Sequence, residues 1–192
     1  MLILASASPR RQDLLREAGI CFDVHPAHID ESRAAGESPL QYACRVAREK
    51  ALAVARDFPH RYVLGADTIV TLDNEVLGKP RDPEDAKRML RLLSNREHEV
   101  TTAVSLVLPS TSLDTRYLTT RVRFRKIDEA EIHAYVACGE PMDKAGAYAI
   151  QGGAQRWTVG IDGDYSNVVG LPLSMVTEML REGGHINKVF TD

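Results

Sequence analysis

Residues 2–11 read LILASASPRR, and this stretch sets the pattern from which the fold can be predicted. The apolar run at its start predicts a buried strand. Ser8 is a favourable helix N-cap and Pro9 suits the first helical position, so a helix should begin here, with Gly19 placed to end it. The stretch therefore predicts a strand, a polar turn and a helix start in immediate succession.

Further helix starts carry similar capping signals along the chain. They lie at residues 38–39, 82–83 and 128–131, and a last helix should follow Leu171 and Pro172. The helix that begins at residue 38 carries apolar residues at helical spacing, and Lys50 lies within it. The helix that begins at residue 82 has acidic residues in its first turn, which favours it electrostatically, and Asn95 can close it.

Strand signals alternate with these helices. Residues 62–65 predict a short buried strand that leads into Asp67, and residues 69–72 and 76–77 resemble the two arms of a hairpin. Residues 100–106 and 118–124 alternate apolar and polar side chains, which is typical of an antiparallel pair. Strand–helix units mixed with hairpins predict an α/β fold with a mixed sheet flanked by helices.

The size and charge of the chain limit the classes of protein to consider. With 192 residues, 44% hydrophobic and 27% charged, residues 1–192 should form a single domain with a real core, either undivided or as two lobes that share a cleft. The formal net charge of -3 disfavours a general nucleic-acid binder, because the molecule as a whole does not attract polyanions. Any anion site must therefore concentrate its cations locally.

Cysteine spacing and hydropathy suggest a location. Cys21, Cys44 and Cys138 lie far apart and form no Cys-x-x-Cys pair, so neither a disulfide framework nor a zinc ribbon is indicated. The apolar residues 1–5 are too short for a signal-peptide core, and no apolar run approaches the length that spans a bilayer. We expect a cytoplasmic protein that does not associate with membranes.

Cationic residues at separate places in the sequence suggest phosphate binding. Arg10 and Arg11 fall in the first turn of a predicted helix, where positive charge is unfavourable unless an anion is present. Together with the Ser8 hydroxyl and exposed backbone N–H groups, they would form an oxyanion cradle. Lys79 follows a strand in a stiff Gly-Lys-Pro segment, which can aim its ammonium. Each of these residues, like Lys50, is also compatible with an ordinary solvated cation when taken alone.

Acidic residues complete the pattern. Asp67 follows a strongly apolar strand, at the kind of position where α/β proteins commonly place ligands, and Asp30 and Glu31 form a second acidic pair. Both are also compatible with turn-capping acids. Attack of water on a phosphoryl group requires neutralised oxygens, a carboxylate that accepts the proton and usually a divalent metal. Motifs of P-loop enzymes, esterases and dinucleotide-binding proteins are missing from the sequence.

These residues fall in ordered blocks that are similar to a known family. The blocks are LASASPRR at 4–11, Glu31, AREKA at 47–51, GADT at 65–68, GKP at 78–80, DKAGAYAIQG at 143–152 and GDYSNVVGLP at 163–172. In these blocks, over nearly its whole length, the chain resembles the Maf proteins, nucleoside triphosphate pyrophosphatases that are also linked to septum formation. The resemblance implies a two-lobed fold similar to the inosine-triphosphate pyrophosphatases, with the nucleotide in the cleft and frequently a homodimer.

The resemblance also implies roles for individual residues. Asp67 would be the proton acceptor, and Glu31 and Asp67 would bind a divalent cation, Mg²⁺ or Mn²⁺. Phosphate contacts would fall to Arg11, Lys50 and Lys79. Residues at the positions that the family uses for base specificity are Arg10, Thr68 and Gln151.

The block around Gln151 looks like the dTTP/UTP branch of the family rather than the 7-methyl-GTP branch. A glutamine amide offers a donor and an acceptor in one plane, complementary to the N3–H and O4 of uracil or thymine, whereas cytosine presents the wrong edge. We therefore expect hydrolysis of dTTP, UTP and modified pyrimidine nucleotides to monophosphate and diphosphate. The alternative is a nucleotide-binding regulator of septum formation that acts through a protein partner.

Overall fold

The computed structural model describes residues 1–109 and 112–185, and its described strands form one seven-stranded sheet. The strand order is β2-β1-β3-β5-β6-β7, with β4 paired to β3. The strands are β1 (Leu2–Leu4), β2 (Phe22–Val24), β3 (Tyr62–Leu72), β4 (Glu75–Leu77), β5 (Glu97–Val107), β6 (Leu113–Phe124) and β7 (Thr158–Asp162). Strand β1 pairs parallel with β2 and β3, whereas the β3–β4 and β6–β7 pairs are antiparallel. The predicted mixed sheet is confirmed.

Helices flank this sheet, as expected. They are α1 (Pro9–Glu17), α2 (Pro39–Ala55), α3 (Pro83–Leu93), α4 (Glu129–Ala137), α5 (Tyr165–Val169) and α6 (Leu173–Glu182), with short 3-10 turns η1 (Glu140–Asp143), η2 (Ala145–Ala147) and η3 (Gly153–Trp157). The capping signals explain the helix starts: Ser38 and Gln41 form a capping box at α2, and Asp82 accepts a hydrogen bond from the Asp85 N–H at α3. Within the described residues, no helix combines the length and the apolar character needed to cross a bilayer.

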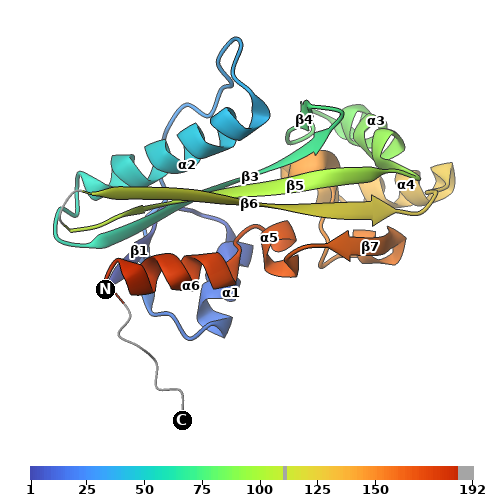
Figure 1. The fold of residues 1–192 in the computed structure, drawn as a ribbon. Coiled ribbons are helices and arrows are strands. Elements are labelled where there is room, and N and C mark those ends of the chain that lie inside the picture. Colours follow the sequence, from blue (N-terminus) through green and yellow to red (C-terminus); the bar gives the residue numbers. More distant parts are fainter. Residues whose placement is uncertain (110–111, 186–192) are drawn as a thin grey trace. The chain divides into compact units, whose positions relative to one another are not determined.

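The chain forms two compact units. The first unit contains the described parts of Met1–Asp67, Thr102–Leu118 and Gly170–Asp192, and the second contains Thr68–Thr101 and Thr119–Val169. In the first unit, α2 covers one face of the sheet and α1 and α6 cover the other (Figure 1). Its core includes Ile3, Val54, Val63 and Val107.

Close approach of α2 to β3 depends on Gly65. A Cβ atom there would lie 2.4 Å from the Ala47 carbonyl oxygen and 2.7 Å from the Ala51 nitrogen, both in the backbone of α2. Glycine removes that clash and lets the helix rest directly on the strand. The close contact brings the middle of β3 to the side chains of α2.

Aromatic side chains form the core of the second unit. Phe124 and Tyr148 meet edge to face, Tyr135 and Trp157 do the same, and His98 packs against Phe124. Such edge-to-face pairs match the quadrupoles of the rings.

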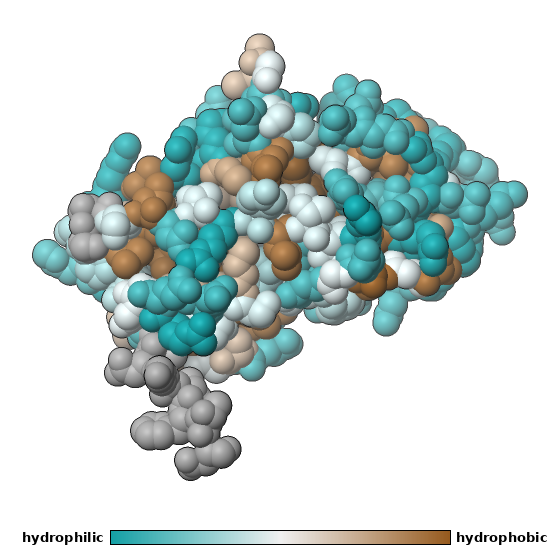
Figure 2. Space-filling model, viewed as in Figure 1, coloured by the Kyte–Doolittle hydropathy of each residue, from teal (hydrophilic) through white to brown (hydrophobic). Residues whose placement is uncertain are grey.

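On the visible surface of the molecule, hydrophilic residues predominate and apolar ones are interspersed (Figure 2).

One detail of the predicted secondary structure is wrong. The strand at residues 62–65 is predicted to end before Asp67, but β3 continues to Leu72, so Asp67 lies inside the strand. The hairpin predicted at residues 69–72 and 76–77 is confirmed, because the end of β3 pairs antiparallel with β4. The difference at Asp67 arises where tertiary contacts rather than local propensity decide the backbone.

Candidate functional site

Lys50 joins two acidic residues in the first unit. Its Nζ atom donates to Asp67 Oδ1 at 2.9 Å and to Glu31 Oε2 at 2.8 Å. Lys50 lies in α2, Asp67 in β3 and Glu31 in the segment between β2 and α2. The structure thus brings together three predicted site residues from separate parts of the chain.

Burial sets the electrostatics of Asp67. Only 7% of the residue is exposed. Loss of hydration raises the pKa of the Asp67 carboxyl, while the nearby charges of Lys50 and Arg11 oppose that rise. A carboxyl group whose pKa is perturbed by burial and by neighbouring charges is a candidate functional residue.

Arg11 is held by backbone carbonyls of two other segments. Its Nε donates to the Gly170 oxygen at 2.9 Å, and its Nη1 donates to the Ala66 oxygen at 2.9 Å and to Ser6 Oγ at 3.2 Å. Burial lowers the pKa of the guanidinium, and the charge of Asp67 acts in the opposite direction. The Arg11 guanidinium is therefore fixed beside Asp67, because it is hydrogen-bonded to Ala66, the residue before Asp67 in β3.

The segment that carries Glu31 is anchored to α2. Tyr42 Oη donates to the Glu31 carbonyl oxygen at 2.9 Å, and Arg45 Nη2 donates to the Ser32 carbonyl oxygen at 2.9 Å. Arg45 also pairs with Glu37, with an Nε–Oε1 distance of 2.7 Å. Glu31 is itself exposed; these contacts hold the backbone of its segment, and Lys50 holds its carboxylate.

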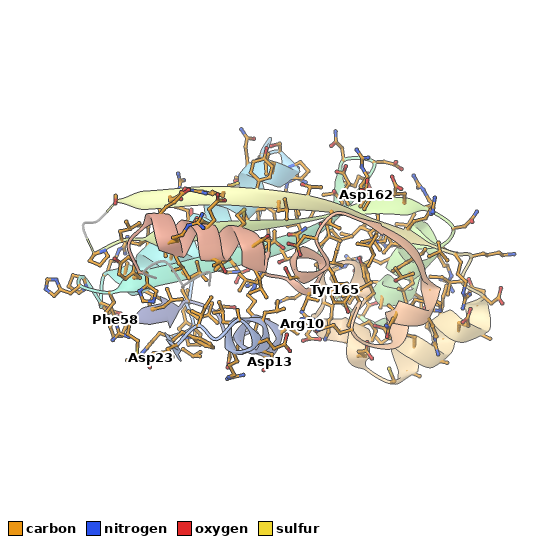
Figure 3. All side chains as sticks on the ribbon, turned by 60° about the horizontal axis from the view of Figure 1, so that its bottom comes forward. Arg10, Asp13, Asp23, Phe58, Asp162 and Tyr165 are labelled. Atoms are coloured by element: carbon orange, nitrogen blue, oxygen red, sulfur yellow. The ribbon has the colours of Figure 1, made fainter. Side chains whose placement is uncertain are left out.

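Ser8 and Arg10 lie at the start of α1, where the sequence places them. Ser8 occupies the N-cap position, but its side chain makes no capping bond, and its N–H donates to Ser6 Oγ at 3.3 Å. Arg10 extends from the first turn of the helix that also carries Asp13 (Figure 3). The two arginines differ: Arg11 is buried, whereas Arg10 is half-buried.

The remaining predicted residues belong to the second unit. Thr68 follows Asp67 directly in β3, and strand alternation places their side chains on opposite faces. Lys79 is exposed in the segment after β4, and Gln151 is exposed in the segment after η2. The Gly146 N–H donates to the Gly78 oxygen at 3.1 Å, so the segments that carry Lys79 and Gln151 meet one residue away from Lys79.

Donor chemistry indicates how a divalent metal would bind. No group of three or more His, Cys, Asp or Glu residues suited to a metal ion occurs in the described part of the chain. Glu31 and Asp67 provide two carboxylates that converge on one ammonium. Mg²⁺ is typically bound by one or two carboxylates, with water and substrate phosphates as further ligands. These two residues therefore fit an ion that binds together with a polyphosphate.

Several residues of this site were not predicted. Ser6, Gly170, Tyr42 and Arg45 hold Arg11 or the Glu31 segment, yet nothing in their local sequence indicates that role. The one available signal is position, because Ser6 and Gly170 lie inside or beside the sequence blocks that carry the resemblance. Their contribution depends on contacts between residues that are distant in the chain.

Fold comparison gives the class of protein. The solved structure of a HAM1 protein from Coxiella burnetii superposes with a TM-score of 0.51 at 16% sequence identity, covering 94% of this chain and 98% of that chain. The mixed sheet with flanking helices is accordingly that of the HAM1-like α/β proteins. At this level of identity, the comparison shows a shared fold and no more.

Sequence comparison identifies the family. A model described as "Maf-like protein" matches residues 1–183. The dTTP/UTP pyrophosphatase of Koribacter versatilis (strain Ellin345) is 56% identical over 183 residues, covering 95% of this chain and 94% of that protein. The dTTP/UTP pyrophosphatase of Anaeromyxobacter sp. (strain Fw109-5) is 51% identical over 189 residues, covering 96% and 90%. The chain belongs to the Maf family.

Proposed function

We propose that this protein hydrolyses dTTP and UTP, and modified pyrimidine nucleoside triphosphates, to the monophosphate and diphosphate. The observation that carries the proposal is the Lys50 ammonium bound by both Asp67 and Glu31, with Arg11 held beside Asp67. Phosphoryl transfer requires a carboxylate that accepts a proton and cations that neutralise the phosphate oxygens, both at one site. Relatives that are more than half identical and are named dTTP/UTP pyrophosphatases support the same activity.

In this proposal, Asp67 accepts the proton of the attacking water. The water oxygen forms a bond to the α-phosphorus, the bond from that phosphorus to the bridging oxygen of the β-phosphate breaks, and pyrophosphate leaves. Burial raises the pKa of Asp67, which makes its carboxylate a stronger base than a solvated one, and the adjacent cations keep it ionised. The rate should therefore fall as the pH decreases. The midpoint of this fall should lie above 3.8, the ordinary pKa of an Asp carboxyl.

Cations of the site neutralise the triphosphate. We assign Arg11, Lys50 and Lys79 to phosphate oxygens, with Ser8 as a hydroxyl donor at the start of α1. Mg²⁺ or Mn²⁺, bound through Glu31 and Asp67, would supply further neutralisation of the phosphate charge. Lys50 already holds both of these carboxylates, so it keeps them together before substrate binds.

Base selection is assigned to Gln151, with Arg10 and Thr68 as further contacts. Gln151 is exposed, so its amide is accessible to a ligand. An amide can accept from N3–H and donate to O4 of uracil or thymine, whereas cytosine has an acceptor at N3 and a donor at C4. This complementarity supports a preference for dTTP and UTP over dCTP and CTP.

We place the reaction in the cytoplasm. Cys21, Cys44 and Cys138 are all free thiols, and two of them are exposed, which suits a reducing compartment. Removal of modified pyrimidine triphosphates from the precursor pool is a role consistent with that location.

The decisive experiment is a panel of nucleoside triphosphates with Mg²⁺ or Mn²⁺ and identification of the products. We expect pyrophosphate and monophosphate from dTTP and UTP. The Asp67→Asn variant should be at least about 100-fold slower, as expected for loss of a general base. Release of orthophosphate instead of pyrophosphate would overturn the reaction, and equal rates for wild type and Asp67→Asn would remove Asp67 from its role.

A second variant tests base selection. Gln151→Ala should reduce the preference for UTP over CTP more than it reduces turnover of UTP, because the amide contributes to recognition rather than to bond breaking. Gln155→Ala is the matched control, since Gln155 is an exposed glutamine four residues away. A uniform loss of rate on all bases in Gln151→Ala would contradict a recognition role.

A further inference from the structure

Gln151 occupies a tight turn in the second unit. The Gly152 N–H donates to the Ala149 carbonyl oxygen at 3.1 Å, which closes a four-residue turn with Ile150 and Gln151 at its centre. Ile150 is buried, with 4% exposed, whereas Gln151 is exposed. The buried Ile150 side chain therefore anchors the turn, and the Gln151 side chain is exposed to solvent.

Both ends of this turn are bound by the same pair of side chains. The Ala149 N–H donates to Tyr135 Oη at 3.0 Å, and the Gly153 N–H donates to Glu140 Oε1 at 3.1 Å. Tyr135 Oη in turn donates to Glu140 Oε1 at 2.8 Å. Ala149, Tyr135, Glu140 and Gly153 thus form a continuous chain of hydrogen bonds that brackets Gln151.

The glycines of the turn allow this close packing. A Cβ atom on Gly152 would lie 2.0 Å from Glu140 Oε1, and one on Gly153 would lie 2.8 Å from the Tyr135 ring. The Tyr135 ring is itself fixed by its edge-to-face contact with Trp157, at 4.9 Å between centroids. The turn consequently rests on side chains that are held by the aromatic core of the unit.

We propose that Tyr135 and Glu140 are specificity-determining positioning residues, which hold the Gln151 turn so that the amide meets a uracil or thymine base. This inference rests on the proposed function. Neither residue touches substrate in this scheme; they act through the backbone of the turn. Burial raises the pKa of Tyr135, which keeps its phenol protonated and able to donate to Glu140. A recognition amide discriminates only when its orientation is fixed, because a mobile one can satisfy either pyrimidine edge.

The test compares kcat/KM for UTP and CTP in wild type, Tyr135→Phe, Glu140→Ala and Glu140→Gln. Tyr135→Phe and Glu140→Ala each break the chain of bonds, so the UTP/CTP ratio should fall about tenfold, the effect of losing roughly one or two net hydrogen bonds. Glu140→Gln should keep most of the preference, because one carbonyl oxygen can still accept from both Tyr135 and Gly153. In a Gln151→Ala background, Tyr135→Phe should change the ratio no further.

Tyr148→Phe is the matched control. It also removes a buried hydroxyl from the aromatic core, but that hydroxyl bonds to His98 at 2.8 Å and not to the turn. Tyr148→Phe should therefore lower the melting temperature without changing the UTP/CTP ratio. A variant that acts through stability alone slows hydrolysis of UTP and CTP equally. If Tyr135→Phe has that effect, the positioning role is wrong.

A second readout separates this inference from the proposed function. Calorimetric binding of the non-hydrolysable α,β-imido analogues of UTP and CTP measures base preference without turnover. Suppose that wild type prefers the UTP analogue, that Tyr135→Phe loses this preference, and that wild type releases no pyrophosphate. These results would support the positioning role and refute the activity. Selective hydrolysis by wild type with an unchanged ratio in Tyr135→Phe would refute the positioning role alone. If wild type showed no base preference in either assay, the positioning role and the base selection assigned to Gln151 would both be refuted, whereas the activity would be refuted only if no pyrophosphate were released.

Discussion

Lys50 and Asp67 form a buried ion pair, with 2.9 Å between Nζ and Oδ1 and only 11% and 10% of their side chains exposed. A buried pair of this kind owes its stability to mutual compensation, because either charge left alone would be poorly hydrated. The two residues are separated by 17 positions in the sequence and come from a helix and a strand. Their pairing links the predicted chemistry to the packing of α2 on β3.

Removal of the ammonium should therefore be costly. Lys50→Met keeps an unbranched side chain but removes the ammonium that pairs with the buried Asp67, and we expect a loss of about 3 kcal/mol in unfolding free energy at pH 7. The measurement is urea denaturation followed by circular dichroism. Lys87→Met, which removes the partner of the exposed Glu84, should cost less than about 1 kcal/mol. Equal effects of the two substitutions would contradict the compensation described for Asp67.

Gly65→Ala tests the contact between α2 and β3. The added methyl group would enter the α2 backbone, so we expect destabilisation of at least about 2 kcal/mol together with loss of activity as Lys50 is displaced from Asp67. For the unfolding free energy, Gly78→Ala is the control, because nothing lies within 4 Å of its Cβ position. The prediction is checked by thermal melting of both variants, and a Gly65→Ala protein as stable as Gly78→Ala would disprove it.

His98 should make stability depend on pH. Burial lowers the pKa of His98 to about 4, from an ordinary value of 6.5. Between these values the unfolded chain takes up a proton that the folded protein does not, so stability falls as the pH decreases from 6.5 towards 4, by about 3 kcal/mol. Equilibrium unfolding of wild type and His98→Gln at pH 7 and pH 4 measures this difference.

The expected result is that His98→Gln loses less stability on acidification than wild type. His60→Gln serves as the control, because His60 is exposed, and it should follow the wild-type curve. If all three proteins show the same acid dependence, the burial of His98 is not its cause.

Tyr42 should affect metal dependence through Glu31. Tyr42→Phe removes the hydroxyl that donates to the Glu31 carbonyl oxygen and leaves the ring in place. We expect the Mg²⁺ concentration for half-maximal rate to rise about tenfold, with the rate recovered at saturating metal. Tyr117→Phe, which removes an exposed hydroxyl from β6, should leave the titration unchanged. An unaltered Mg²⁺ titration in Tyr42→Phe would show that this bond does not position Glu31.

Local signals in the sequence predicted the helices well. The starts of α2 and α3 followed from Ser38, Pro39 and Asp82, because a cap and a first-turn proline act within a few residues. Asn95, expected to close α3, adopts a positive φ of 58° directly after the helix. Such features depend on short-range geometry and need no knowledge of the rest of the fold.

The position of Asp67 could not be predicted in the same way. An acid in the middle of a strand is unfavourable by propensity, so the pattern indicated a strand end. The strand continues because Lys50 compensates the buried carboxylate, and no local pattern encodes that partner. The burial of Arg11 is similar, since its carbonyl acceptors lie 55 and 159 residues further along the chain.

The bond from Arg11 to the Gly170 oxygen also has a consequence for biosynthesis. Arg11 depends on an acceptor that is made 159 residues after it. Closure of so long a loop is a late event in folding, because its entropy must be offset by contacts that already exist. A nascent chain that stops short of residue 170 lacks this acceptor, so Arg11 reaches its final position beside Asp67 only after residue 170 has been made.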